Sequence, residues 1–170
     1  EVYRGMAAIT AEHGGAVVGG DVVRASELFI SVSAVGTLAG EAGSGGEDGL
    51  QALLRSTARP GDVIAVTGEL GSAAGGLKSL EQGTTNGRER LIERLHRPTP
   101  RIAAGAALLA AGVRCAIDIS DGLISDLGHI CEASGVSAVV RLADTPVSPL
   151  LKELFPDEWA GLALSGGEDY

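Results

Sequence analysis

Aromatic residues and lysines are scarce in this sequence. Aromatic side chains make up 3% of its 170 residues, and lysine occurs only at Lys78 and Lys152. The formal net charge is -9, which argues against nucleic acid or an anionic membrane as the main partner. A chain this acidic is better suited to holding cations.

Cysteines and long apolar runs are also scarce. Cys115 and Cys131 form no CxxC motif and lie among apolar residues. We interpret them as buried free thiols in a reducing cytosol and expect a cytoplasmic protein. No signal peptide pattern is visible. The most apolar helical stretch, residues 102–113, is too short and too rich in alanine and glycine to span a bilayer.

The length of the chain suffices for one domain or for parts of two. Residues 39–49 are rich in glycine, serine and acidic residues, and they predict a boundary between domains at 1–42 and 43–170. The sequence opens inside a predicted helix and stops within a motif at Tyr170. We therefore expect it to be a piece of a longer polypeptide.

The periodicity of apolar residues predicts an α/β (α+β) protein. Apolar positions at helical spacing predict helices at residues 2–13, 50–56, 73–80, 88–96, 102–111 and 148–155, and one that begins at residue 123. Runs rich in β-branched or apolar residues predict strands at residues 16–18, 29–35, 63–67, 113–119, 136–142 and 162–164.

The strand predicted at residues 113–119 leads directly into two carboxylates. Alternation places Asp118 and Ser120 on one face, and Asp121 follows at the turn before the next helix. Ligands of α/β sheets bind at the carboxyl ends of strands. Two carboxylates about 4 Å apart repel by about 4 kcal/mol at an effective dielectric of about 20, so a cation is needed nearby. Oxygen ligands of this kind favour Mg²⁺.

Two more carboxylates lie beside glycines. Asp21 follows Gly19 and Gly20, where the absence of side chains lets a ligand approach the backbone. Glu168 belongs to a Ser-Gly-Gly-Glu-Asp string at residues 165–169, and the same string occurs at residues 44–48. We interpret the earlier copy as a solvated loop and the later one as functional.

Several other kinds of site find no support. The glycine-rich turn at residues 68–72 lacks the lysine of a phosphate-binding loop, so we interpret it as a tight turn between strand and helix. The sequence contains no GxGxxG motif and no His/Cys spacing typical of zinc sites. The spacing of its residues does not support a Ser/His/Asp catalytic arrangement. His13, His96 and His129 carry no functional prediction; Asp126 and His129 are expected on the polar face of their helix. The carboxylates and glycines together predict a Mg²⁺-dependent nucleotide or phosphate enzyme that needs no covalent nucleophile.

The motifs as a set resemble those of the thiamine-monophosphate kinase family. The string Asp-Ile-Ser-Asp-Gly-Leu-Ile-Ser-Asp-Leu-Gly-His stands at residues 118–129, and the others are at residues 19–21, 55–62, 68–75 and 165–170. They occur in the order of the family and cover nearly the whole chain. The resemblance implies transfer of the ATP γ-phosphate onto thiamine phosphate, giving thiamine diphosphate, with several Mg²⁺ ions and a homodimer.

The resemblance also implies a fold and a set of site residues. The fold would be the two-domain aminoimidazole-ribonucleotide-synthetase-like architecture, with the end of the N-terminal domain and much of the C-terminal domain present. The implied ligands are Gly20, Asp21, Arg55 and Ser120 for ATP, Asp21, Asp118 and Asp121 for Mg²⁺, and Glu168 for thiamine phosphate.

Parts of the family pattern are absent from this sequence. An early Gly-Asp-Asp-Ala segment, a second metal-binding aspartate, an early substrate-contacting histidine and a later C-terminal substrate contact are all missing, so we expect the fragment alone to be inactive. The alternatives are another ATP-using enzyme of the same superfamily, acting in purine synthesis, selenophosphate synthesis or hydrogenase maturation, or a catalytically silent nucleotide-binding relative.

Overall fold

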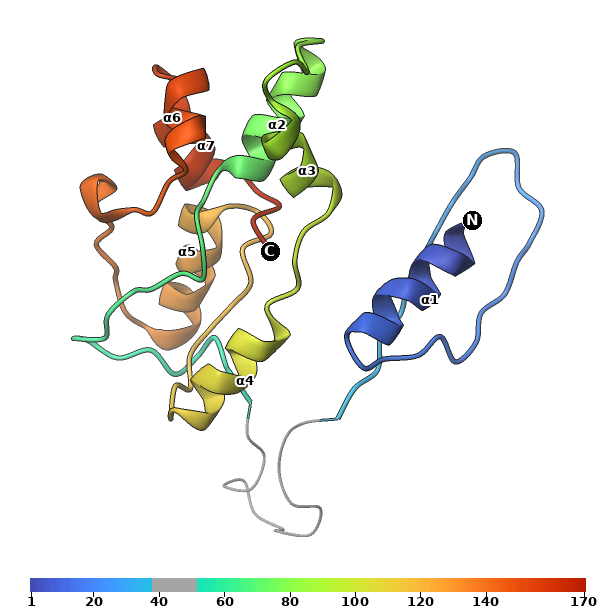
Figure 1. Ribbon diagram of the computed structural model, residues 1–170. Helices are drawn as coiled ribbons and strands as arrows, with labels where there is room; N and C mark the ends of the chain where they lie inside the picture. Colours follow the sequence, from blue (N-terminus) through green and yellow to red (C-terminus); the bar gives the residue numbers. More distant parts are fainter. Residues whose placement is uncertain (38–51) are drawn as a thin grey trace, which may run out of the picture. The chain divides into compact units, whose positions relative to one another are not determined.

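The computed structural model describes residues 1–37 and 52–170 (Figure 1). Its contacts divide the chain into two compact units, Glu1–Leu38 and Ala39–Tyr170. The domain boundary expected between residues 42 and 43 stays a prediction. The earlier Ser-Gly-Gly-Glu-Asp string, at residues 44–48, lies outside the described residues.

The first unit contains one helix, α1 (Val2–Glu12), which confirms the helix expected at residues 2–13. It ends before Gly14, whose φ of 76° is in the left-handed region, and the Gly15 N–H donates to the Thr10 carbonyl at 2.7 Å. The strands predicted at residues 16–18 and 29–35 are not formed in this structure. Val18 and Val35 are almost fully exposed, and within the described part of the first unit no segment pairs with either predicted strand.

In the described part of the second unit, residues 52–170, the regular elements are helices. They are α2 (Ser72–Glu81), α3 (Glu89–His96), α4 (Ile102–Ala110), α5 (Leu123–Ser134), the 3₁₀ turn η1 (Leu142–Asp144), α6 (Pro149–Leu154) and α7 (Trp159–Ser165). Helices α2 to α6 confirm the sequence predictions for these segments to within one or two residues. Within the described ranges, no helix is both long and apolar enough to cross a membrane.

Two predicted elements of the second unit differ from the structure. Residues 52–56 form a bridge and a turn where a helix was expected. Residues 162–164, expected as a strand, belong to α7, where Ala163 is fully buried. A short apolar run does not by itself distinguish a buried strand from a buried helix, and here contact with α2 and α5 selects the helix.

The predicted strands of the second unit form only isolated bridges among the described residues. Parallel bridges join Leu54 to Cys115 and Leu70 to Val147, and the described residues contain no continuous strand. Val63 and Val139 are 90% and 80% exposed, although their segments have the apolar composition of buried strands. A strand forms only where a neighbour accepts and donates its backbone hydrogen bonds, and among the described residues the segments at 63–67 and 136–142 have no backbone hydrogen bond to a residue distant in the sequence.

The core of the second unit gathers around α2, which packs against α3 (Figure 1). Small residues on α2 allow close approach: a Cβ on Gly76 would lie 2.4 Å from the Leu91 carbonyl oxygen. Leu91 and Leu151 are buried, and Leu151 has no exposed surface at all. The buried cluster consists of Leu70, Leu91, Leu123, Val147, Leu151, Phe155 and Ala163. Trp159 packs against this cluster.

Candidate active site

The candidate site is built on the turn between residue 119 and the start of α5. Gly122 occupies the position before α5 with φ 112°, a conformation that favours glycine. A Cβ there would lie 2.9 Å from the Ser165 carbonyl carbon, so the end of α7 packs directly against the turn. Because residue 122 is a glycine, the turn and the end of α7 can pack directly against each other.

Four of the predicted ligands line one hollow beside this turn. Its volume is about 350 Å³, and it is lined by Arg55, Ala116, Ile117, Asp118, Ser120, Asp121, Asp126 and His129. Asp118 and Asp121 both have exposed side chains. The structure therefore brings Arg55, Ser120 and the two carboxylates together, although Arg55 is more than 60 residues distant in the sequence.

Backbone pairing explains how Arg55 reaches the hollow. The Leu54 N–H donates to the Arg114 carbonyl at 2.7 Å, and the Leu54 carbonyl accepts from the Ala116 N–H at 3.2 Å. The Ser134 hydroxyl, at the end of α5, donates to the Arg55 carbonyl at 2.8 Å. Arg55 is thereby held between the segment that leads to Asp118 and the far end of α5.

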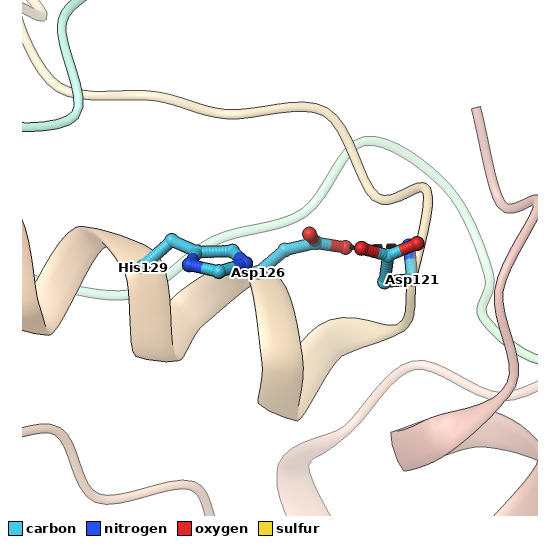
Figure 2. A group of neighbouring side chains, drawn as sticks. All are labelled: Asp121, Asp126 and His129. Carbon is cyan, nitrogen blue, oxygen red and sulfur yellow. Dashed lines mark hydrogen bonds between the residues drawn. The ribbon is translucent and has the colours of Figure 1, made fainter.

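Asp126 is a site residue that the sequence prediction placed wrongly. Its side chain was expected on a polar helix face, but the residue is only 3% exposed. Figure 2 shows that the Asp126 carboxylate points back to the turn, where its Oδ2 accepts from the Asp121 N–H at 3.0 Å. The same oxygen accepts from the Gly122 N–H at 3.1 Å. An acidic residue in the first turn of a helix is the sequence signal that could have indicated this role.

His129 follows Asp126 by one turn of α5 and extends the same cluster. Potential ligand atoms of Asp121, Asp126 and His129 all lie within 4.8 Å of one another (Figure 2). His129 was expected to be an exposed helical histidine, and it is exposed, but it also lines the hollow. The spacing of three residues between Asp126 and His129 places both on one side of the helix.

The C-terminal segment lies against the same turn. The Glu168 N–H donates to the Ser120 carbonyl at 3.0 Å, and the Asp169 N–H donates to the Ile119 carbonyl at 3.1 Å. Glu168 is exposed and has φ 65°, which is uncommon for a residue with a side chain. Glu168 is thus brought next to Ser120, as their assignment to one site requires.

Asp169 is a second residue whose place the sequence did not reveal. Its Oδ2 accepts from the Gly71 N–H, immediately before α2, at 2.6 Å. Burial raises the pKa of this carboxyl from its ordinary 3.8 to about 6, against the lowering effect of backbone hydrogen bonds from Gly71 and Ala73. Its partner is 98 residues away, so no local pattern could indicate the contact.

The electrostatics of the site favour a cation. The pKa of the Tyr170 phenol is raised by desolvation and then by the negative charges of Glu168, Asp118, Asp121 and Asp126. Desolvation can contribute little, since Tyr170 is 40% exposed, and we regard the carboxylates as the informative cause. In the described part of the chain the ion pairs are Lys78–Glu158 and Arg141–Asp144, neither of which neutralises these carboxylates.

The remaining predicted ligands belong to the first unit. Gly20 and Asp21 are exposed, and the Asp21 Oδ1 accepts from the following Val22 N–H at 2.8 Å. Their roles toward ATP and Mg²⁺ stay predictions.

The fold and the motifs define the class of the chain. The family model described as AIR synthase related protein, C-terminal domain, matches residues 59–166, and the chain belongs to this family. Among curated relatives, the thiamine-monophosphate kinase of Methanopyrus kandleri is 39% identical over 163 residues, which is 94% of this chain and 49% of the relative. That of Bacillus subtilis is 38% identical, over 99% of this chain and 51% of the relative.

Solved structures agree with these relatives. The crystal structure of thiamine-monophosphate kinase from Stenotrophomonas maltophilia matches with a TM-score of 0.67 and 44% identity, covering 71% of this chain and 40% of that one. The structure of AaThiL complexed with AMPPCP and TMP matches with a TM-score of 0.64 and 34% identity, over 69% of this chain and 40% of that one.

These similarities confirm two predictions from the sequence. The aminoimidazole-ribonucleotide-synthetase-like fold is confirmed, as is the resemblance to thiamine-monophosphate kinases. The chain spans about half the length of the curated relatives it matches.

Proposed function

We propose that this chain forms part of a thiamine-phosphate kinase, which transfers the γ-phosphate of ATP to thiamine phosphate and yields thiamine diphosphate. The observation that carries the proposal is the convergence of Arg55, Asp118, Ser120 and Asp121 on one hollow. These residues come from motifs that resemble the kinase family, and relatives named as such kinases match along nearly the whole chain.

The nucleotide side of the site is assigned to Arg55 and Ser120. A guanidinium group presents parallel N–H donors that match phosphate oxygens, and Arg55 is the cationic residue that lines the hollow. Ser120 lies between Asp118 and Asp121 in the sequence. Its side chain is short, and its hydroxyl can donate to a phosphate oxygen. Gly20 and Asp21 of the first unit would complete the contacts to ATP.

The metal side of the site is assigned to Asp118 and Asp121, with Asp21 from the first unit. The donor set fits Mg²⁺, because exposed carboxylate oxygens share a hollow with negative potential and no ion pair among the described residues neutralises them. Bound Mg²⁺ would neutralise phosphate charge during transfer. The two aspartates would hold the cation, and Asp126 fixes the backbone of Asp121.

The acceptor side of the site is assigned to Glu168. Its backbone N–H bonds to the Ser120 carbonyl, so the residue assigned to thiamine phosphate is adjacent to one assigned to ATP. Direct phosphoryl transfer requires this adjacency, since the attacking and leaving oxygens must be held in line. No covalent intermediate is included in this mechanism.

The assembly and cellular setting are part of the same proposal. We expect a homodimer in the cytoplasm, with thiamine phosphate and ATP as its small-molecule partners and no nucleic-acid or membrane partner. We also expect the 170-residue chain alone to be inactive, because the family motifs that are absent from this sequence are needed to complete the site.

The decisive experiment measures ADP release from ATP and Mg²⁺ by the full-length protein, with thiamine phosphate added or withheld. Release that depends on thiamine phosphate, with thiamine diphosphate as the product, supports the kinase. Folded protein that binds ATP but shows no such dependence would favour another ATP-using enzyme of the AIR synthase related family. ATP binding without turnover on any acceptor would favour a catalytically silent relative.

A further inference from the structure

We propose that Asp169 is a positioning residue, which holds Glu168 at the acceptor side of the site by tying residues 166–170 to the start of α2. The inference rests on the proposed function in one respect, the role of Glu168 toward thiamine phosphate. The tie itself is a structural relationship and can be tested without turnover.

One end of the tie is a rigid anchor. The Gly71 N–H, which donates to the Asp169 Oδ2 at 2.6 Å, belongs to a residue enclosed by the core. A Cβ on Gly71 would lie 2.7 Å from a Leu151 methyl carbon and 2.9 Å from the Ala163 backbone nitrogen. Gly71 therefore has little room to move, and a side chain bonded to it is fixed relative to α2.

At its other end, the tied segment contacts the turn at residues 119–122, which contains Ser120, a residue assigned to ATP. Glu168 and Asp169 donate their N–H groups to the carbonyls of Ser120 and Ile119. A Cβ on Gly167 would lie only 2.2 Å from the Ser120 carbonyl oxygen, so the two backbones are in direct contact. The segment is thus held from two directions: by backbone pairing on one side and by the Asp169 side chain on the other.

Glu168 itself is in a conformation that needs such support. Among the described residues it is the one non-glycine residue with positive φ, at 65°. Conformations of this kind persist where the surroundings impose them, and they concentrate at functional sites. Because both Glu168 and its neighbour Asp169 are bonded, the direction in which the Glu168 side chain leaves the backbone is set.

The chemistry of Asp169 favours a functional reason for its presence. Its raised pKa means that ionised Asp169 is less favourable in the folded protein than in the unfolded chain. A neutral residue at this position would avoid that cost. Strained or costly groups of this kind are expected where a site must be positioned.

The test compares Asp169→Ala with the unmodified full-length protein in steady-state kinetics with both substrates. We expect the KM for thiamine phosphate to rise about tenfold or more, while the KM for ATP changes less than about threefold. Asp169→Asn keeps a carbonyl oxygen that can accept from the Gly71 N–H, and it should recover most of the acceptor affinity. Asp157→Ala, at an exposed acidic residue before α7, is the matched control and should match the unmodified protein.

A second measurement does not depend on activity. Hydrogen exchange at the amides of Gly71, Glu168 and Asp169 should be faster in Asp169→Ala and close to normal in Asp169→Asn. Unchanged exchange together with an unchanged acceptor KM would overturn the inference. An equal rise in both KM values with a lowered melting temperature would also overturn it, because it would indicate a general structural role.

The outcomes also separate this inference from the proposed function. If the unmodified protein shows no release of ADP that depends on thiamine phosphate, the proposed function fails, and the exchange rates then decide the tie alone. If Asp169→Ala does not fold, the test compares Asp169→Asn, which keeps an accepting oxygen, with Asp169→Leu, which has none. Equal KM values for thiamine phosphate in these two folded variants would contradict the tie.

Discussion

The carboxylate of Asp126 accepts a hydrogen bond from the backbone N–H of Asp121 at 3.0 Å, five residues earlier in the chain. The same oxygen accepts from the Gly122 N–H at 3.1 Å, so a single buried atom holds the turn at two points. Asp121 is consequently presented with its backbone fixed and its side chain exposed. An acidic helix start thus supports an assigned metal ligand without itself having to bind the metal.

Removal of the Asp126 side chain should therefore lower both stability and affinity. In Asp126→Ala two backbone N–H groups lose their acceptor inside the protein, which should cost about 1–3 kcal/mol of unfolding free energy. Mg²⁺–ATP binding should weaken as well, because Asp121 is no longer held. Urea denaturation and calorimetry measure the two effects, with Glu132→Ala, at an exposed residue of α5, as the control. Equal stability of Asp126→Ala and the control would contradict the role of Asp126.

Asp121→Asn should separate function from folding. The side chain is exposed, so the substitution should leave the unfolding free energy within about 0.5 kcal/mol of the original. Binding of Mg²⁺–ATP should fall by about tenfold or more, because an amide oxygen carries no formal charge to offset the cation. Titration calorimetry on the full-length protein measures the change. Retention of full affinity would show that Asp121 is not a metal ligand.

Removal of Mg²⁺ from the unmodified protein should weaken ATP binding, just as Asp121→Asn should. A ligand that binds only the folded protein raises its melting temperature by mass action. We expect Mg²⁺ and ATP together to raise the melting temperature of the full-length protein, and a chelator such as EDTA to abolish the rise. A variant with Asp118→Asn and Asp121→Asn should show no rise at all. A rise of equal size in the presence of chelator would exclude the metal from the site.

Stability should depend on pH through Asp169. Its pKa is about 6 in the folded protein and 3.8 ordinarily, so between these values the folded state binds the proton more tightly. The contribution of Asp169 is therefore fully present below about pH 3.8 and is lost as pH rises through about 6. The unfolding free energy of the original protein minus that of Asp169→Asn should fall over this interval and level off above it. A difference that rises over the same interval would reverse the assigned direction of the shift.

The core predicts a large effect at one leucine and a small effect at another. Leu151 has no exposed surface and packs within the buried cluster, so Leu151→Ala should cost about 2–5 kcal/mol of unfolding free energy. Leu77 lies on the exposed side of α2, so Leu77→Ala should lower the unfolding free energy by less than about 1 kcal/mol. Chemical denaturation of both variants measures the difference. Similar losses at the two positions would argue against the described packing of α2 and α6.

Local periodicity sufficed for most helices of this chain. Helices α1 to α6 were predicted because apolar residues at helical spacing are a local signal. Helix α7 was missed because a three-residue apolar run carries no period. The strand segments were recognised by composition, but composition does not supply the neighbour that a strand needs, and most of these segments are unpaired here.

Some residues of the candidate site could be predicted from local sequence, and others could not. Asp118, Ser120 and Asp121 could be predicted because an apolar run ends at them within a few residues, and local sequence alone places them together. The sequence by itself also determined the acidic character that suits a cation and the motifs that the relatives share. Only the tertiary structure decided that Arg55 joins them, that Asp126 is buried, and that Asp169 bonds to Gly71. Each of these depends on contacts between segments far apart in the chain or on which helix face meets the core, and neither is fixed until the whole unit packs.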